Sequence, residues 1–150
     1  MTLTPLHILI VEDEGLIAMD IEGIIEDGGH VVVGSAVCAN EAIALYDRWK
    51  PELCIIDVEL LDGTTGIEVA EHIRSKGGTA FIFLTATPKR LHGDYRGGIG
   101  VLSKPFTHRQ LSSTLSYLNE GLFDPPPALA CPSNLNLSSA FRHDWAPRIA

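Results

Sequence analysis

The sequence predicts one doubly wound α/β domain, in which helices cover both faces of a five-stranded parallel sheet. Short and nearly continuous apolar runs are typical of strands that are buried on both faces. Between these runs lie segments whose apolar residues recur at helical spacing. This alternation of strands and helices favours a parallel sheet with right-handed crossovers. The length of 150 residues suits a single domain with at most a tail.

Five segments are expected to form the strands. Four of them are apolar runs, and the remaining one, second in the chain, follows the turn signal Asp27-Gly28-Gly29. In chain order, the five segments are residues 7–11, 31–33, 53–56, 80–84 and 101–102. None of the runs approaches the roughly 18 apolar residues that a membrane-spanning helix needs.

Four helices are expected from the spacing of apolar residues, within residues 17–24, 42–49, 67–73 and 111–118. Two of them start with the sequence of a capping box, at Thr65–Glu68 and at Thr107–Gln110. A fifth helix, over residues 88–98, is expected to be marginal. It has only two apolar residues at helical spacing, and it contains a glycine that costs about 1 kcal/mol relative to alanine.

The α/β domain is predicted to span residues 1–119, and residues 120–150 are interpreted as a proline-containing, flexible tail. The segment Asp124-Pro-Pro-Pro127 cannot continue a helix, and the residues after it are rich in Ser, Asn and Ala without a period. The alternative is that the apolar side chains of this segment dock on the domain or on a partner. These are Leu135, Leu137, Phe141 and Trp145.

The net charge of −8 argues against a protein that binds nucleic acid through its phosphates. The charge is unevenly distributed, with thirteen acids and two bases in residues 1–62 and six acids and nine bases in residues 63–150. We interpret the early excess of acids as part of an acidic site, with solvated helix faces as the alternative. The absence of a signal-peptide pattern and of a C-x-x-C motif favours a cytoplasmic protein with reduced cysteines and no membrane contact.

Polar side chains stand at the carboxyl ends of four predicted strands. Glu12 and Asp13 follow the first strand, Asp57 the third, Thr85 the fourth, and Lys104 lies just beyond the fifth. In open α/β sheets, the site lies beyond these strand ends, where the strand order reverses. With the expected order 2-1-3-4-5, three carboxylates, one hydroxyl and one ammonium converge on one crevice.

Three carboxylates in one crevice need a counter-charge. At separations of about 4 to 5 Å, each pair repels by about 3 to 4 kcal/mol at an effective dielectric constant near 20. Mg²⁺ supplies this charge and accepts carboxylate and phosphate oxygens. We expect Glu12 and Asp13 to hold the ion, and Lys104 and Thr85 to bind phosphoryl oxygens. Asp57 is then the candidate nucleophile, which attacks phosphorus to form an aspartyl phosphate.

These strand ends resemble those of the receiver domain of bacterial response regulators, the phosphoacceptors of two-component signalling. The resemblance covers about residues 5–119, and it implies a flavodoxin-like fold. Four segments carry it, in the order of the family: Val11-Glu12-Asp13-Glu14, Ile56-Asp57, Leu84-Thr85-Ala86 and Ser103-Lys104-Pro105-Phe106.

The resemblance implies a role for each site residue. Asp57 is the phosphorylated residue, Thr85 carries a switch hydroxyl, and the peptide bond between Lys104 and Pro105 is cis. The implied Mg²⁺ ligands are Asp13, Asp57 and the backbone carbonyl of Glu59, with Glu12 assisting through water.

The resemblance also implies partners. The phosphoryl donor is a histidine kinase or a histidine phosphotransfer protein, and the signal passes to a downstream protein target, with a homodimer left open. The chain is then no enzyme beyond phosphoryl transfer and self-dephosphorylation.

Three departures from the family pattern stand out. Val101 occupies the position of an aromatic switch residue, so the chain lacks there the rotating ring to which the family usually couples the switch hydroxyl, here on Thr85. Leu61 replaces a proline, and the loop from Asp57 to Gly66 is one residue longer than usual.

Two other functions are weighed against the phosphoacceptor. One is a small aspartate-nucleophile phosphatase of the haloacid-dehalogenase type, because Asp57-Val58-Glu59 faintly echoes its two-acid motif. That family has a second aspartate two residues after the first and a cap that excludes water, and neither is evident. The other is a non-phosphorylated adaptor with a receiver fold, which is disfavoured because every site group is present.

Overall fold

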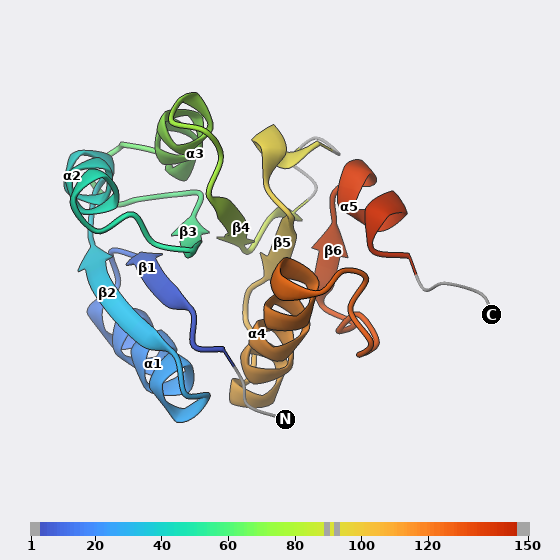
Figure 1. Ribbon diagram of the computed structural model, residues 1–150. Coiled ribbons are helices and arrows are strands. Elements are labelled where there is room, and N and C mark those ends of the chain that lie inside the picture. Colours follow the sequence, from blue (N-terminus) through green and yellow to red (C-terminus); the bar gives the residue numbers. More distant parts are fainter. Residues whose placement is uncertain (1–3, 89–90, 92–93, 147–150) are drawn as a thin grey trace.

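The computed structural model describes residues 4–88, 91 and 94–146. In this part of the chain, a six-stranded sheet lies between helices on both faces (Figure 1). The strand order is β2-β1-β3-β4-β5-β6, so the predicted order of the first five strands is confirmed. These five are parallel, and β6 pairs with β5 in the antiparallel direction. The strands are β1 His7–Val11, β2 Val31–Ala36, β3 Leu53–Asp57, β4 Ala80–Thr85, β5 Gly100–Ser103 and β6 Leu135–Leu137.

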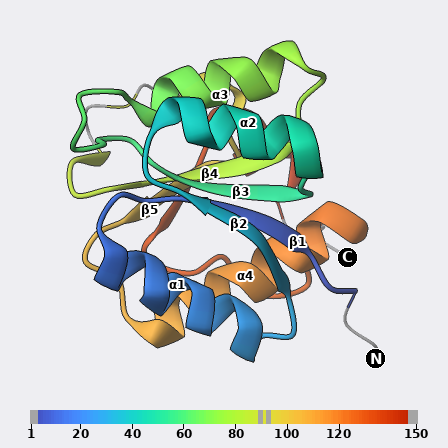
Figure 2. The same cartoon turned by 90° about the vertical axis from the view of Figure 1, so that its left-hand side faces the viewer.

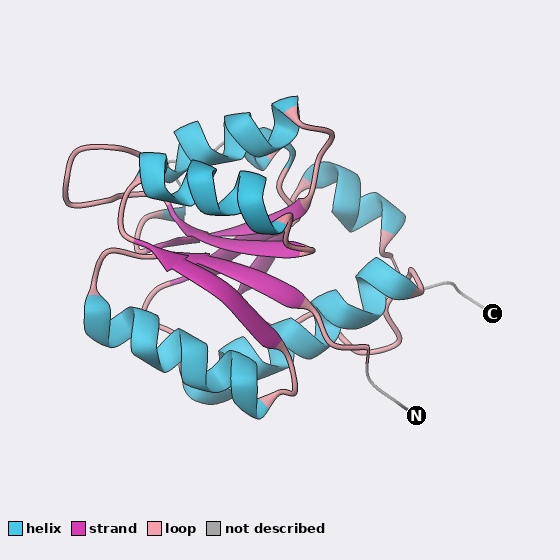
Figure 3. Cartoon of the chain, turned by 60° about the vertical axis from the view of Figure 1, so that its left-hand side comes forward, coloured by secondary structure: helices cyan, strands magenta, loops and turns pink. Residues whose placement is uncertain are grey.

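Helices α1 and α4 cover one face of the sheet, and α2 and α3 cover the other (Figures 2 and 3). The apolar run of β1 serves both faces. Ile8 and Ile10 belong to the core on the α1 and α4 side, whereas Leu9 and Val11 belong to the core on the α2 and α3 side. This is why the strands lack polar alternation. The helices are α1 Gly15–Asp27, α2 Ala39–Trp49, α3 Gly66–Ser75, α4 His108–Phe123 and α5 Ser139–Asp144. None of those in the described part is long and apolar enough to cross a membrane.

The prediction of a helix over residues 88–98 is wrong for the described residues of that segment. The regular structure between β4 and β5 there includes no α-helix, and a short 3₁₀ turn covers Tyr95–Gly97. Tyr95 and Arg96 have φ angles of 45° and 54°, and the left-handed region cannot continue an α-helix. Residues 89, 90, 92 and 93 of the predicted helix lie outside the described residues.

The C-terminal segment differs from the expected flexible tail over residues 124–146. It adds β6 to the edge of β5 and then forms α5. Leu135 and Trp145 are buried in the core that also contains α4, with Trp145 only 5% exposed. The composition of this segment, rich in Ser, Asn and Pro, is typical of a flexible tail. Its few apolar side chains nevertheless bury enough surface to dock it on the domain.

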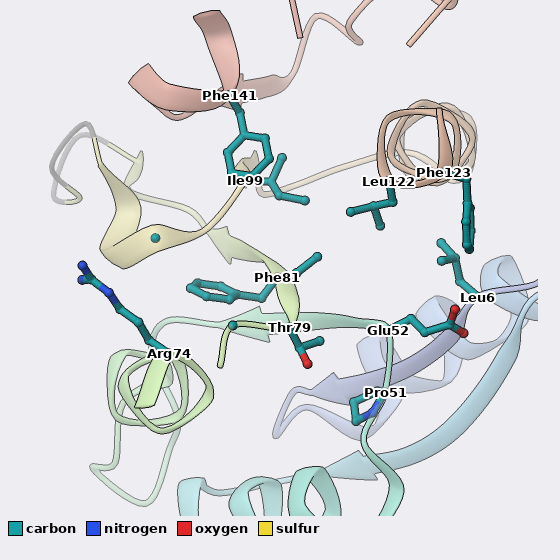
Figure 4. Close-up of a pocket in the computed structure, with 13 residues that line it drawn as sticks. Leu6, Pro51, Glu52, Arg74, Thr79, Phe81, Ile99, Leu122, Phe123 and Phe141 are labelled. Carbon is teal, nitrogen blue, oxygen red and sulfur yellow. The ribbon is translucent and has the colours of Figure 1, made fainter. Parts of the chain in front are cut away.

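A groove of about 540 Å³ lies where the parallel strands begin, among residues that precede or open β1, β3, β4 and β5. Leu122 and Phe141 approach it from α4 and α5, and Phe81 lines it from β4 (Figure 4). The predicted site residues stand at the other ends of these strands. The groove is therefore separate from the predicted site.

His30 provides a pH-sensitive contact at the start of β2. It is 6% exposed, and its Nδ1 accepts a hydrogen bond of 3.0 Å from the Leu6 N–H, which requires an unprotonated Nδ1. Burial lowers the pKa of His30 below its ordinary value of 6.5. The unfolded chain therefore binds a proton that the folded chain resists, so this contribution to stability is complete above pH 6.5 and is lost as the pH falls below it.

We expect His30→Asn, which keeps an acceptor but cannot titrate, to flatten the fall in stability below pH 6.5. The difference in slope should be at most about 1.4 kcal/mol per pH unit, the limit for one proton. Urea unfolding between pH 5 and 8 measures it. The control is His143→Asn, because the side chain of His143 is 91% exposed. Equal slopes for His30→Asn and the natural chain contradict the assignment.

Candidate phosphoryl-transfer site

The predicted site residues meet at the carboxyl edge of the sheet. Glu12 and Asp13 directly follow β1, and Asp57 and Thr85 are the last residues of β3 and β4. Lys104 directly follows β5, whose Ser103 pairs with Thr85. Parallel pairing in register brings these ends together, as the sequence predicts.

Glu12, Asp13 and Asp57 form a compact acidic cluster. One carboxylate oxygen from each lies within 4.8 Å of the others. The Lys104 Nζ donates hydrogen bonds of 2.8 Å to Glu12 Oε2 and 2.8 Å to Asp57 Oδ2. Three carboxylates thus face one ammonium, and the cluster keeps an excess of negative charge.

Backbone N–H groups from the loops after β1 and β3 orient the three carboxylates. The Glu14 N–H donates to Glu12 Oε1 at 3.2 Å, and the Glu59 N–H donates to Asp57 Oδ1 at 3.0 Å. The Leu61 N–H donates to Asp13 Oδ2. Proline has no N–H, so the family's usual residue at position 61 could not make this last bond. The substitution by Leu61 therefore gives Asp13 an additional support.

Burial and the neighbouring charges shift the pKa values of two groups in the cluster. Burial raises the pKa of the Glu12 carboxyl to about 7, with the hydrogen bond from Lys104 opposing the shift and the charge of Asp57 adding to it. Burial disfavours the charged form of Lys104, but the hydrogen bonds to Asp57 and Glu12 outweigh it, so the pKa of Lys104 is raised. Lys104 is therefore a permanent cation at the centre of the site.

Thr85 is near the cluster, but its hydroxyl is engaged elsewhere. Thr85 Oγ1 accepts a hydrogen bond of 3.0 Å from the Thr87 N–H and lies 3.3 Å from Thr87 Oγ1. Its carbonyl accepts a bond of 2.9 Å from the Lys104 N–H, which fixes β4 to β5 beside the cluster. The peptide bond between Lys104 and Pro105 is cis, as the resemblance implies.

Val101, at the position of the family's aromatic switch residue, is fully buried in the core on the α2 and α3 side. That core also contains Phe81 and Phe83. No aromatic ring at position 101 is thus available to rotate between a buried and an exposed position.

The sequence did not identify Gly66 as part of the site. A Cβ at Gly66 would lie 2.3 Å from the Asp57 carbonyl oxygen and 2.6 Å from Ile56 Cγ2. Its N–H donates a bond of 2.9 Å to the Val58 carbonyl. Only glycine lets α3 begin this close to the end of β3.

The capping box predicted at Thr65–Glu68 is wrong, because the Thr65 side chain makes no capping hydrogen bond. Thr65 instead pairs with Glu59 in an isolated β-bridge. The capping box at Thr107–Gln110 is confirmed.

The donor set fits Mg²⁺. The cluster supplies carboxylate oxygens, and one oxygen from each of its three residues lies within 4.8 Å of the others. Its net negative charge calls for a divalent cation before a phosphoryl group can approach. Nitrogen or sulfur ligands, which Zn²⁺ prefers, are not among the described members of the cluster.

The fold and this acidic site are those of a response-regulator type of signalling module. The chain belongs to the family of response regulator receiver domains, whose model matches residues 8–116. It is 37% identical over 112 residues to the phyllosphere-induced regulator PhyR of Methylorubrum extorquens, a match that covers 73% of this chain and 42% of that protein.

Solved structures agree with this assignment to the receiver-domain family. The receiver domain of PhyR from Erythrobacter litoralis matches with a TM-score of 0.70 and 31% identity, covering 83% of this chain and 97% of that chain. The anti-anti-sigma factor PhyR of Bartonella quintana, complexed with the anti-sigma factor NepR, matches with a TM-score of 0.51 and 40% identity over 53% of this chain and 33% of that chain. The chain spans about half the length of the curated relatives it matches.

Proposed function

We propose that this protein is a phosphoacceptor, which receives a phosphoryl group on Asp57 and signals by protein contact. The observation that carries the proposal is the Lys104 ammonium, held 2.8 Å from Asp57 inside a cluster of three carboxylates. A structural ion pair has no need of the third carboxylate, Asp13, which raises the repulsion and pairs with no cation in the described part of the chain. A site for a cation and a phosphoryl group does need it.

The transfer uses the residues as follows. A carboxylate oxygen of Asp57 attacks phosphorus, a bond forms between them, and the bond from phosphorus to the donor's leaving group breaks. Lys104 holds one phosphoryl oxygen, and the Thr85 hydroxyl, after turning away from Thr87, donates a hydrogen bond to another. Asp13, Asp57 and the Glu59 carbonyl would hold Mg²⁺, with Glu12 assisting through water, and the ion would supply positive charge to offset that of the phosphoryl group.

The proposed donor is a histidine kinase or a histidine phosphotransfer protein, and the proposed receiver of the signal is another protein. The Bartonella PhyR, which is complexed with NepR, supports a protein target by analogy. It also keeps open the adaptor function, in which the same contacts form without phosphorylation.

Acetyl phosphate with Mg²⁺ tests the phosphoacceptor against its alternatives. We expect intact-mass analysis to detect one acid-labile phosphoryl group per chain, and none after addition of EDTA. Turnover of varied phosphomonoesters would identify a phosphatase instead. No uptake at all, under conditions where the protein is folded, would favour the adaptor.

The two acids after β1 are expected to differ in their effect on Mg²⁺ binding. Both oxygens of Glu12 already accept hydrogen bonds, from Glu14 and Lys104, so Asp13 is the better direct ligand. Asp13→Ala should therefore weaken Mg²⁺ binding severely and Glu12→Ala less so. Calorimetric titration measures both, with Glu14→Ala as the control, and equal or reversed effects contradict these roles.

A further inference from the structure

Strand β6 is attached unevenly to the edge of β5. Far from Asp57, the Ser138 N–H donates a bond of 2.8 Å to the Ile99 carbonyl. Beside the site, the corresponding contact is a longer bond of 3.3 Å from the Ser103 N–H to the Asn134 carbonyl. The residue that holds this weaker end is the direct neighbour of Lys104.

The side chain of Asn134 weakens the same end further. Its Nδ2 and Oδ1 are both buried and have no hydrogen-bond partner within residues 4–88, 91 and 94–146. A buried amide without partners destabilises the state that buries it, because water would satisfy both atoms. Detachment of β6 from the site end relieves this penalty.

Two glycines on the surface under β6 and α5 allow these elements to approach closely. A Cβ at Gly100 would lie 2.5 Å from the Asn136 carbonyl oxygen, and one at Gly121 would lie 2.4 Å from the Trp145 ring. The Trp145 ring also meets the Tyr117 ring edge-on, with centroids 5.6 Å apart. We call residues 134–145 the C-terminal clasp, and the β5 edge together with Tyr117 and Gly121 the docking surface.

We propose that the C-terminal clasp is a built-in competitor for a protein that binds the docking surface, and that phosphorylation releases it. This inference rests on the proposed role of Asp57. Ser103 pairs with Thr85 on one side and bonds to Asn134 on the other. The strand order places Asp57 and β6 on opposite sides of β5. Lys104 already contacts Asp57, whereas the Thr85 hydroxyl is still engaged with Thr87. A phosphoryl group that draws Thr85 toward Asp57 therefore pulls the paired Ser103 away from Asn134.

Once the clasp is released, the exposed docking surface determines the chemistry of the partner that it can bind. The β5 edge offers backbone groups to an extended segment, as in strand addition. The glycine at position 121 leaves room for a large aromatic ring against Tyr117. The partner is therefore a protein segment that pairs as a short strand and carries an aromatic anchor, as the clasp itself does.

Tryptophan fluorescence tests the release in the full chain. The sequence has two tryptophans, and Trp49 is 49% exposed on α2, so Trp49→Phe leaves Trp145 as the reporter of the clasp. Beryllofluoride with Mg²⁺ serves as the phosphoryl mimic, and ¹⁹F NMR verifies that it is bound. We expect a red shift of the Trp145 emission and stronger quenching by acrylamide, toward the values of the unfolded chain.

A matched pair of variants tests the role of the buried amide. Asn134→Leu removes the unsatisfied amide and should reduce the red shift, because it favours the docked clasp. Asn136→Leu makes the same change at an exposed position of β6 and should leave the shift unchanged.

The outcomes separate the two proposals. If the ¹⁹F signal of bound beryllofluoride is missing, the phosphoacceptor role is contradicted, and so is the release of the clasp, which depends on it. Bound beryllofluoride with an unchanged Trp145 spectrum overturns the clasp while leaving the phosphoacceptor intact. Equal effects of the two asparagine variants overturn the role of Asn134.

Discussion

Asp57→Asn is expected to abolish uptake of the phosphoryl group from acetyl phosphate. The asparagine amide keeps the shape of the side chain, but it removes the negative oxygen that attacks phosphorus. It also removes one of the two carboxylates that hold Lys104, and one ligand of the proposed Mg²⁺ site. Intact-mass analysis after incubation with acetyl phosphate and Mg²⁺ should therefore detect no acid-labile adduct.

The matched control for this variant is Asp62→Asn, in the same loop. The exposed Asp62 carboxylate accepts bonds from Thr64 and takes no part in the cluster. This variant should be labelled like the natural chain. A phosphorylated Asp57→Asn chain would assign the nucleophile to another residue.

Gly66→Ala is expected to have the largest effect on stability among simple glycine substitutions at the site. The added methyl group would meet the Asp57 carbonyl oxygen and the Ile56 side chain at distances no Cβ tolerates, so α3 or β3 must shift. Overpacking of this kind typically costs about 1 to 3 kcal/mol, and more where backbone must move. Urea unfolding measures the loss, and the same displacement of β3 should slow phosphorylation of Asp57.

Gly23→Ala in α1 provides the opposite control. A Cβ there meets nothing within 4 Å, and alanine is the better helix former. The variant should be more stable by about 0.5 to 1 kcal/mol. A Gly66→Ala chain as stable as the natural protein would contradict the close approach of α3 to β3.

Much of the site could be predicted because it depends on strand ends. A buried parallel strand is a short apolar run, and the first polar residue after it marks the carboxyl edge. The sequence positions of Asp57 and Lys104, each at the end of an apolar run, are therefore enough to predict that they lie together. The role of Gly66 escaped prediction, because its requirement comes from a contact with β3 rather than from its own local pattern.

The C-terminal segment and residues 88–98 show where local patterns fail. Leu135 and Trp145 are stabilised by contacts with α4 and β5, and no periodicity within residues 120–150 reveals such contacts. At Thr65, pairing with Glu59 replaces the predicted capping bond. Tertiary contacts outweigh local preference in the C-terminal segment and at Thr65. In residues 88–98 the left-handed φ angles of Tyr95 and Arg96 rule out the α-helix, and no apolar periodicity reveals them.

The position of β6 has a consequence for solubility. An unpaired edge strand presents a row of backbone donors and acceptors that any other extended chain can use, and this is a route to aggregation. With β6 in place, β2 is the remaining edge of the described sheet. Every molecule whose β6 is displaced exposes a second such edge, so selection for solubility favours a displaced state that is short-lived or quickly covered by a partner.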